Sequence, residues 1–246
     1  MKIWAHRGCS QMYPENTLLS FRKAMEIEGL TGIELDIQLT KDGHMVVIHD
    51  ERVDRTTNGQ GFVLDFTLEE LKNLEISAKE CGQEEPERIP TIEEVLDLLQ
   101  DKMKEGLKLN IELKNSVYYY EGMEEKIVQL VRERGLEQSV VYSTFYAKSV
   151  RRLRELAPEA EIGVLDVKIS DCYFKMNGGS GGNALHPFWQ GMDLSPEEVK
   201  EAGVPVRAWL SGHLYPEKPT GGRLDLERLE NMGITDVFLN EPERYV

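Results

Sequence analysis

Several features that mark whole classes of protein are missing from this 246-residue sequence. No run of 18 apolar residues is present, so we expect no membrane-spanning segment. A strand-like run follows Met1 at once, which leaves no room for the basic and apolar regions of a signal peptide. The three cysteines, Cys9, Cys81 and Cys172, are an odd number and form none of the close pairs of a zinc site. A reducing cytoplasm is therefore the predicted location.

Positive charge is also scarce. Lysine and arginine number 29 against 44 aspartates and glutamates, for a formal net charge of −15. This excess disfavours nucleic acid and anionic membranes as partners, and we expect neither. A small anionic substrate is compatible with it, because local positive charge in a pocket can outweigh the net charge. The composition, 40% hydrophobic and 30% charged, is that of a soluble globular protein.

Strand-like and helix-like segments alternate along the whole length, which is typical of a parallel α/β fold. The β-rich runs cover residues 3–6, 32–37, 45–49, 107–113, 139–144, 161–165, 183–186, 204–210 and 236–239. Amphipathic helical patterns cover residues 17–29, 91–103, 120–135, 147–156, 195–203 and 225–233. Residues 176–183 contain four glycines and are expected to form a mobile loop.

The nine predicted strands are one more than an eight-stranded barrel needs. Residues 41–43, Lys-Asp-Gly, join two strands too closely for a helical crossover, so residues 45–49 are expected to form an antiparallel hairpin. The other eight strands predict a (β/α)8 TIM barrel, one domain over residues 1–246 with an insertion at about 50–90 over one mouth. An open doubly wound sheet is the alternative, and the lack of a glycine-rich phosphate loop weighs mildly against it.

Acidic side chains share one face of two predicted strands. In GIELDIQL, Glu34 and Asp36 lie two residues apart, so both carboxylates point the same way. In KLNIELKN, the same alternation places Glu112 on one face with Asn110 and Lys114. If these faces line the barrel, the carboxylates need a cation or must be protonated, and oxygen ligands favour a hard ion such as Mg²⁺, Ca²⁺ or Mn²⁺ over zinc. The alternative is that each strand faces solvent with stabilising Glu–Lys pairs.

Two histidines lie at predicted strand ends near this face. His6 ends the first strand, and His49 ends the hairpin, roughly opposite Glu34. A pair of imidazoles supplies one general base and one general acid near neutral pH. Arg7 adds a planar fork suited to phosphate or carboxylate oxygens, and Lys114 either contacts substrate or only pairs with the neighbouring carboxylate. No role is predicted for the other histidines, His44, His186 and His213.

The order of several short motifs resembles a known family. HRG is followed by PENT, ELDIQLTKDG, VVIHD, RTTNGQG and IELK between about residues 3 and 114. This run of spaced motifs resembles the glycerophosphodiester phosphodiesterase family, of the phospholipase C-like phosphodiesterase superfamily. The resemblance implies a TIM-barrel enzyme that releases glycerol 3-phosphate and an alcohol from a small glycerophosphodiester. It further implies attack by the glycerol 2-hydroxyl through a cyclic phosphate, which water then opens.

The resemblance also assigns roles to residues, in agreement with the strand faces. It implies one divalent cation on Glu34, Asp36 and Glu112, acid/base roles for His6 and His49, and a phosphate contact for Arg7. In PENT, it implies that Glu15 supports the site while Asn16 and Thr17 cap the first helix.

The second half of the chain departs from the family's pattern. Trp209 is kept, and we expect it to be a packed aromatic residue. Leu210, Ser211 and Gly212 stand where the family usually continues Thr-Val-Asn, and Asn240 stands where an aspartate is usual. We expect these positions to shape the side of the site that holds the leaving group, and so the substrate preference.

Two other functions fit parts of the pattern. A phospholipase D-like enzyme acting on lysophospholipids or sphingolipids would keep the barrel and the metal, but no basic amphipathic segment for docking on lipid is evident. A catalytically silent binding barrel predicts that a histidine or carboxylate of the set is missing, and all five are present. The head group on the alcohol and the oligomeric state are not readable from the sequence.

Overall fold

The computed structural model describes residues 1–210 and 223–246. In these residues the strands are β1 (Lys2–His6), β2 (Gly32–Leu39), β3 (Met45–Val47), β4 (Lys108–Leu113), β5 (Val140–Thr144), β6 (Glu161–Asp166), β7 (Ala184–Pro187), β8 (Arg207–Trp209) and β9 (Asp236–Leu239). The helices are α1 (Leu18–Met25), α2 (Leu68–Lys72), α3 (Ile92–Lys104), α4 (Met123–Glu133), α5 (Ala147–Leu156), α6 (Ile169–Lys175), α7 (Pro196–Glu201) and α8 (Leu226–Asn231). Short helical turns are η1 (Val63–Asp65), η2 (Lys79–Cys81), η3 (Glu137–Ser139), η4 (Met176–Ser180) and η6 (Pro242–Arg244).

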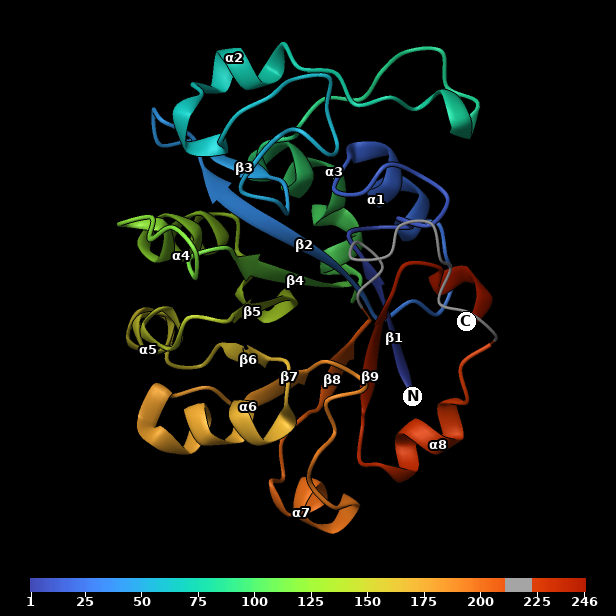
Figure 1. Cartoon of the computed structure of the whole chain (residues 1–246), viewed down its shortest axis with the longest axis vertical. Coiled ribbons are helices and arrows are strands. Elements are labelled where there is room, and N and C mark those ends of the chain that lie inside the picture. Colours follow the sequence, from blue (N-terminus) through green and yellow to red (C-terminus); the bar gives the residue numbers. More distant parts are fainter. Residues whose placement is uncertain (211–222) are drawn as a thin grey trace.

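Eight parallel strands of the described residues form a nearly closed barrel with helices around it (Figure 1). Their order is β7-β6-β5-β4-β2-β1-β9-β8. Two isolated parallel bridges, Leu185–Val206 and Phe188–Trp209, join β7 to β8 and complete the ring. The remaining strand, β3, pairs antiparallel with β2, as the short Lys-Asp-Gly connection predicts. The predicted TIM barrel with an added hairpin strand is confirmed.

Two strands, β3 and β8, are shorter than the sequence predicts by two residues or more. β3 ends at Val47, so His49 lies in a bend after the strand. The reason is Gln38, whose Nε2 donates to the carbonyls of residues 48, 49 and 50 at 3.1, 3.1 and 2.6 Å and so holds this segment in a turn. β8 begins at Arg207 because Pro205 has no N–H with which to extend the ladder.

The segment predicted as a loop at residues 176–183 is helical over residues 176–180. The chain continues from α6 into η4, a π-helical segment in which Gly179 takes a left-handed conformation with φ of 84°. Arg154 Nε donates to the carbonyl of Gly181 at 2.7 Å and fixes the end of the segment. The glycines therefore permit an ordered turn at this point. α6 itself was not predicted from the sequence.

The apolar core lies between the strands and the surrounding helices. Ile33, Leu35 and Ile37 of β2 are fully buried in it together with Phe21 of α1 and Leu96 of α3. Because side chains alternate along a strand, this packing turns the intervening polar residues of β2 into the barrel. None of the helices in the described part of the chain is long and apolar enough to cross a bilayer.

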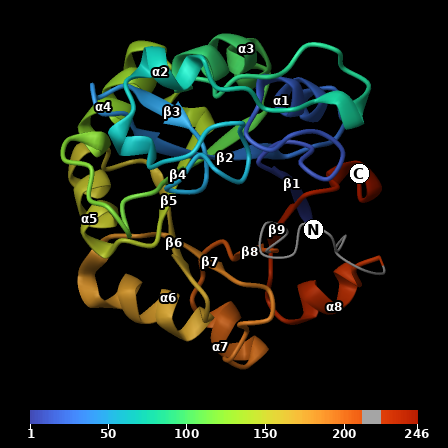
Figure 2. The same cartoon turned by 45° about the horizontal axis from the view of Figure 1, so that its top comes forward.

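The excursion, residues 48–91 between β3 and α3, packs on a small apolar cluster of its own. This cluster contains Val46, Ile48, Val53, Val63, Leu71, Ile76 and Ile89. In Figure 1 the excursion extends beyond β3 and α3 at the top of the molecule, and in Figure 2 it lies beside α3 in the upper part. Its end is defined by Thr91, which forms the predicted capping box with Glu94 at the start of α3.

Candidate active site

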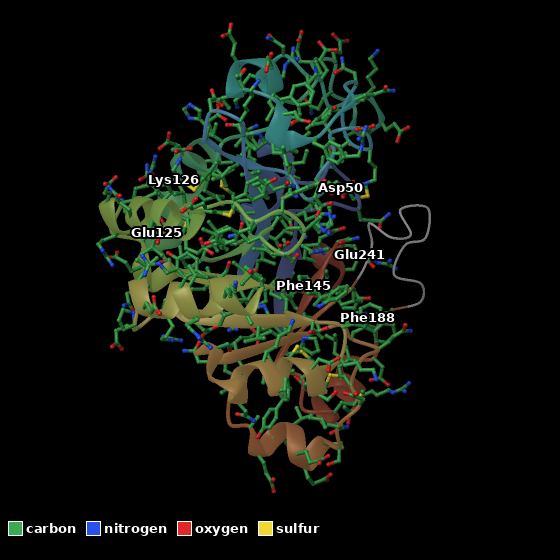
Figure 3. The ribbon with its side chains drawn as sticks, turned by 60° about the vertical axis from the view of Figure 1, so that its left-hand side comes forward. Asp50, Glu125, Lys126, Phe145, Phe188 and Glu241 are labelled. Atoms are coloured by element: carbon green, nitrogen blue, oxygen red, sulfur yellow. The ribbon has the colours of Figure 1, made fainter. Side chains whose placement is uncertain are left out.

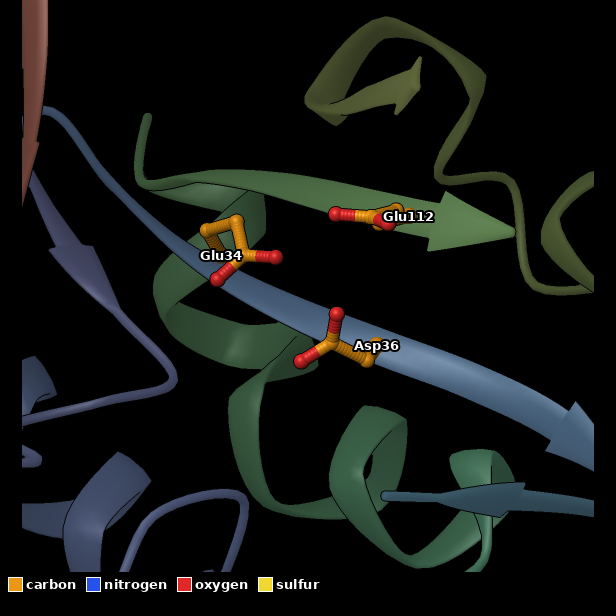
Figure 4. A group of neighbouring side chains, drawn as sticks. All are labelled: Glu34, Asp36 and Glu112. Atoms are coloured by element: carbon orange, nitrogen blue, oxygen red, sulfur yellow. The ribbon is translucent and has the colours of Figure 1, made fainter. Parts of the chain in front are cut away.

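The parallel register places polar residues of three neighbouring strands side by side. β1 and β2 pair His6 with Glu34, and β2 and β4 pair Glu34 with Asn110 and Asp36 with Glu112. One oxygen atom from each carboxylate, Glu34, Asp36 and Glu112, lies within 4.8 Å of the other two. Figure 4 shows these three side chains pointing toward one another from β2 and β4. The convergence predicted from the strand faces is therefore present in the structure.

Burial makes this carboxylate cluster unfavourable without a cation. Burial raises the pKa of Glu34 well above its ordinary value, and the charges of Asp36 and Glu112 add to the effect. Burial also raises the pKa of Glu112. The pKa of Asp36 is lowered, because the positive side chains around it outweigh its burial. Two of the three carboxyls thus resist ionisation, an effect that a bound cation reverses.

The donor atoms of the cluster fit a hard divalent cation. Carboxylate oxygens are the ligands that Mg²⁺ and Ca²⁺ take in proteins. Two buried oxygens at the cluster, Asp36 Oδ1 and Asn110 Oδ1, have no hydrogen-bond partner among residues 1–210 and 223–246. Such oxygens are costly in a protein interior unless an ion or a water molecule satisfies them.

His6 is oriented by the last strand of the barrel. Its Nδ1 lies 2.7 Å from Oδ1 of Asn240, which directly follows β9. An amide oxygen only accepts, so Nδ1 of His6 carries a hydrogen. Nε2 is then directed to the cluster, 3.8 Å from Glu34 Oε2. Asn240, for which we expect a role on the leaving-group side, thus contacts an imidazole.

His49 is held through both ring nitrogens. Its Nδ1 lies 2.7 Å from Asp50 Oδ1, and its Nε2 lies 3.1 Å from Lys114 Nζ. Lys114 also donates to Glu112 Oε1 at 2.8 Å. Burial acts to lower the pKa of Lys114, but the charges of Glu112 and Asp36 raise it. An ammonium only donates, so His49 Nε2 accepts and its ring hydrogen is on Nδ1. The ion pair predicted as one of two roles for Lys114 is present.

Arg7 joins the PENT segment to the cluster. Its Nη1 donates to Glu15 Oε1 at 2.9 Å, and its Nε lies 3.4 Å from Asp36 Oδ2. Asn16 donates from Nδ2 to the same Asp36 oxygen at 2.9 Å. Thr17 alone is the N-cap of α1, so the prediction that Asn16 shares the capping is wrong. The short polar side chain of Asn16 is used inside the barrel instead.

A left-handed turn carries His6 and Arg7 to these positions. Arg7 and Gly8 have φ values of 58° and 79°. The backbone N–H of Arg7 donates to both Glu34 O and Glu34 Oε2, at 2.9 and 3.0 Å. Left-handed conformations are strained for residues other than glycine, and here backbone hydrogen bonds hold the strained residue next to the carboxylates.

Replacing Gly8 with alanine is expected to lower the free energy of unfolding by about 1–3 kcal/mol or more. The new Cβ would lie 2.5 Å from Ser20 Oγ and 2.7 Å from the Ser20 carbonyl carbon, in a backbone conformation that alanine resists. Urea unfolding measures the loss. Gly135→Ala is the matched control, since Gly135 is also left-handed at φ of 64° but has open space around it. A loss at Gly8 no larger than at Gly135 would contradict the steric explanation.

A cavity of about 300 Å³ lies above the cluster, with one polar and one apolar wall. The polar wall includes His6, Arg7, Glu34, His49, Glu112 and Lys114, and the apolar wall includes Phe145, Leu165, Trp209 and Phe238. Trp209 packs on Phe188 and Phe145, with ring centroids 4.8 and 6.2 Å away. Figure 3 labels Phe145 and Phe188, which lie close together in that view. The predicted packing role of Trp209 is present, and the side chain also lines the cavity.

Other residues of the site carry weaker sequence signals. His186 lines the cavity fully buried, and burial, followed by the charge of Arg207, lowers its pKa well below the ordinary value. In the sequence, its position at the end of a strand before Pro187 indicates that His186 lies near the mouth of the barrel. For Asp50, the one indication in the sequence of a role at the site is that it directly follows His49. Leu210 is buried, while Ser211, Gly212 and His213 lie outside the described residues.

Comparisons with known proteins agree with this geometry. The sequence model of the glycerophosphoryl diester phosphodiesterase family matches residues 6–176. A glycerophosphodiester phosphodiesterase of Caldanaerobacter subterraneus subsp. tengcongensis is 41% identical, with 99% of this chain and 96% of that protein covered. A protein of the same name from Bacillus altitudinis is 36% identical, with 100% and 96% covered.

Solved structures add the same fold. A phosphodiesterase of Oleispira antarctica, in complex with the product sn-glycerol-3-phosphate, superimposes with a TM-score of 0.77 at 27% identity, with 99% of this chain and 94% of that chain covered. A glycerophosphodiester phosphodiesterase of Agrobacterium tumefaciens has a TM-score of 0.76 at 24% identity, with 99% and 97% covered. As its ordered motifs predict, the chain belongs to the glycerophosphoryl diester phosphodiesterase family.

Proposed function

We propose that this protein hydrolyses small glycerophosphodiesters to sn-glycerol 3-phosphate and an alcohol, with one divalent cation and two histidines. The observation that carries the proposal is the convergence of Glu34, Asp36 and Glu112 within 4.8 Å beneath a cavity lined by His6 and His49. The activity named for the relatives and the product bound by the Oleispira antarctica enzyme support the choice of substrate.

In the proposed mechanism the two imidazoles move protons at Nε2. A divalent cation on the carboxylates would draw charge from the phosphate and lower the pKa of the glycerol 2-hydroxyl. One imidazole, neutral at Nε2, takes that hydroxyl proton as the oxygen attacks phosphorus, and the other, present as the imidazolium, gives its Nε2 proton to the departing alcohol. The family's mechanism implies a cyclic phosphate, which water then opens as the two rings exchange roles. Arg7 and Lys114 offset negative charge on the phosphate oxygens.

The two walls of the cavity suggest how a diester is oriented. We propose that the polar wall holds the phosphate and the glycerol hydroxyls, because it carries Glu34 and Glu112 of the cluster, both imidazoles and the two cationic side chains. The apolar wall, with Phe145 and Trp209, then faces the alcohol. A volume of about 300 Å³ suits a small substrate.

Removal and return of the metal tests this function directly. Release of glycerol 3-phosphate is measured by a coupled assay on the choline, ethanolamine, inositol and glycerol diesters, with a lysophospholipid in parallel. We expect EDTA to abolish release, and Mg²⁺, Ca²⁺ or Mn²⁺ to restore it. Release that EDTA leaves unchanged would contradict the metal dependence. Turnover of the lysophospholipid alone would favour the phospholipase D-like function.

A further inference from the structure

One guanidinium of the excursion binds two carboxylates at the edge of the site. Arg55 donates from Nη1 and Nη2 to Glu15 Oε2 and Oε1, at 2.7 and 2.8 Å. It also donates from Nε and Nη2 to Asp50 Oδ2 and Oδ1, at 2.6 and 3.0 Å. Each carboxylate is therefore held by two hydrogen bonds from the same planar fork. A lysine cannot reproduce this geometry, because its ammonium is a single point of charge.

Each of these carboxylates in turn holds a side chain of the proposed machinery. Asp50 Oδ1 lies 2.7 Å from Nδ1 of His49, and Glu15 Oε1 accepts from Nη1 of Arg7 at 2.9 Å. Burial acts to raise the pKa of Glu15, but the positive charges of Arg7 and Arg55 outweigh it and lower the pKa. Glu15 therefore stays ionised and keeps both cations in place.

The loop that carries Arg55 is itself anchored. Val53 is fully buried in the cluster of the excursion, and its carbonyl accepts from N and Oγ1 of Thr57 at 3.1 and 2.8 Å. Asn58 and Glu75 exchange two further hydrogen bonds, at 2.9 and 2.8 Å. The backbone on both sides of Arg55 is thus held by the rest of the excursion, which fixes the position of the guanidinium.

We propose that Arg55 is a positioning residue that couples the excursion to the active site by fixing Asp50 and Glu15 together, and through them His49 and Arg7. The proposal rests on the proposed function for its kinetic consequence. Without the guanidinium, Asp50 and Glu15 lose their common partner, and the two side chains that they orient lose support. A displacement of about 1 Å in such a constellation costs on the order of 10²-fold in rate.

Kinetics of the metal-loaded enzyme test the proposal. For Arg55→Ala we expect kcat to fall by about 10²-fold. Arg55→Lys keeps the positive charge but not the planar guanidinium, and we expect kcat of this variant to fall by at least about tenfold. Arg52→Ala is the matched control on the same loop, since the exposed Arg52 contacts Asp54 and the Phe62 ring and is not part of the contacts to Asp50 and Glu15, and kcat should stay within about twofold. Wild-type-like turnover in both Arg55 variants would overturn the proposal.

Chemical rescue separates positioning from a general structural role. Added guanidinium ion should restore part of the lost kcat in Arg55→Ala, because it can occupy the space between the two carboxylates. Urea has a similar shape but no charge, and it should not restore activity. Equal rescue by guanidinium and urea, or no rescue by either in a variant whose thermal unfolding matches the wild type, would overturn the proposal.

A measurement without substrate tests the role of Arg55 independently of the proposed hydrolysis. The ¹⁵N resonances of the His49 ring report its hydrogen bond to Asp50 in the intact protein. They should shift in Arg55→Ala and in Arg55→Lys, and should be unchanged in Arg52→Ala. Unchanged resonances in both Arg55 variants would overturn the positioning role. If instead the wild type hydrolyses no diester, the proposed function fails while this spectrum still decides the role of Arg55.

Discussion

Alanine at His6 or at His49 is expected to lower kcat by about 10²–10⁴-fold, the usual contribution of general acid–base catalysis. Both rings carry a hydrogen on Nδ1, toward Asn240 and Asp50, which leaves Nε2 for proton transfer; Nε2 of His6 lies 3.8 Å from Glu34, and Nε2 of His49 accepts from Lys114. Removal of either ring removes one proton transfer from the proposed mechanism. KM should change much less than kcat, because neither ring is the main charge that holds the phosphate.

Steady-state kinetics with saturating cation, together with circular dichroism, check this expectation. His44→Ala is the matched control, since His44 is exposed in a turn and lies 3.8 Å from Asp42. It should leave kcat unchanged. The double variant should lose less than the product of the two single losses, because the rings act in one reaction. Near-full activity in both single variants would reject the roles of His6 and His49.

Glu34→Gln is expected to lower kcat/KM by about 10³-fold or more at limiting cation, since the charge stabilisation by a catalytic metal amounts to several kcal/mol. Stability should respond in the opposite way. Burial and two neighbouring carboxyls raise the pKa of Glu34, so its charge is a cost in the metal-free protein. The amide oxygen of glutamine can still accept from the N–H of Arg7. The melting temperature in EDTA should therefore equal or exceed that of the wild type.

Thermal unfolding with and without cation separates these two effects. A cation at about 100 times its Kd stabilises the wild type by about 2.7 kcal/mol, and this gain should shrink in Glu34→Gln. Glu161→Gln is the matched control, because Glu161 begins β6 and pairs with Arg207 away from the cluster. It should keep the full response to cation. An undiminished response in Glu34→Gln would show that Glu34 is not a ligand.

The strand faces could be predicted from the sequence because alternation is a local property of a strand. Glu34 and Asp36 share a face whatever β2 pairs with, and the same holds for Glu112 in β4. The hairpin of β3 was also local, since three residues of turn left no room for a crossover. The end of β3 was not a local property, because the side chain of Gln38, on the neighbouring strand, holds residues 48–50 in a turn.

What the sequence by itself determined was the alternation of elements, the polar faces inside the barrel and the set of carboxylates and imidazoles. Only the tertiary structure decided which partner orients each of them. His6 meets Asn240 across 234 residues, and Glu15 meets Arg55 across 40. Such pairs depend on closure of the barrel and on the path of the excursion. No local periodicity of the sequence encodes the closure of the barrel or the path of the excursion, since both follow from how many separate segments pack together.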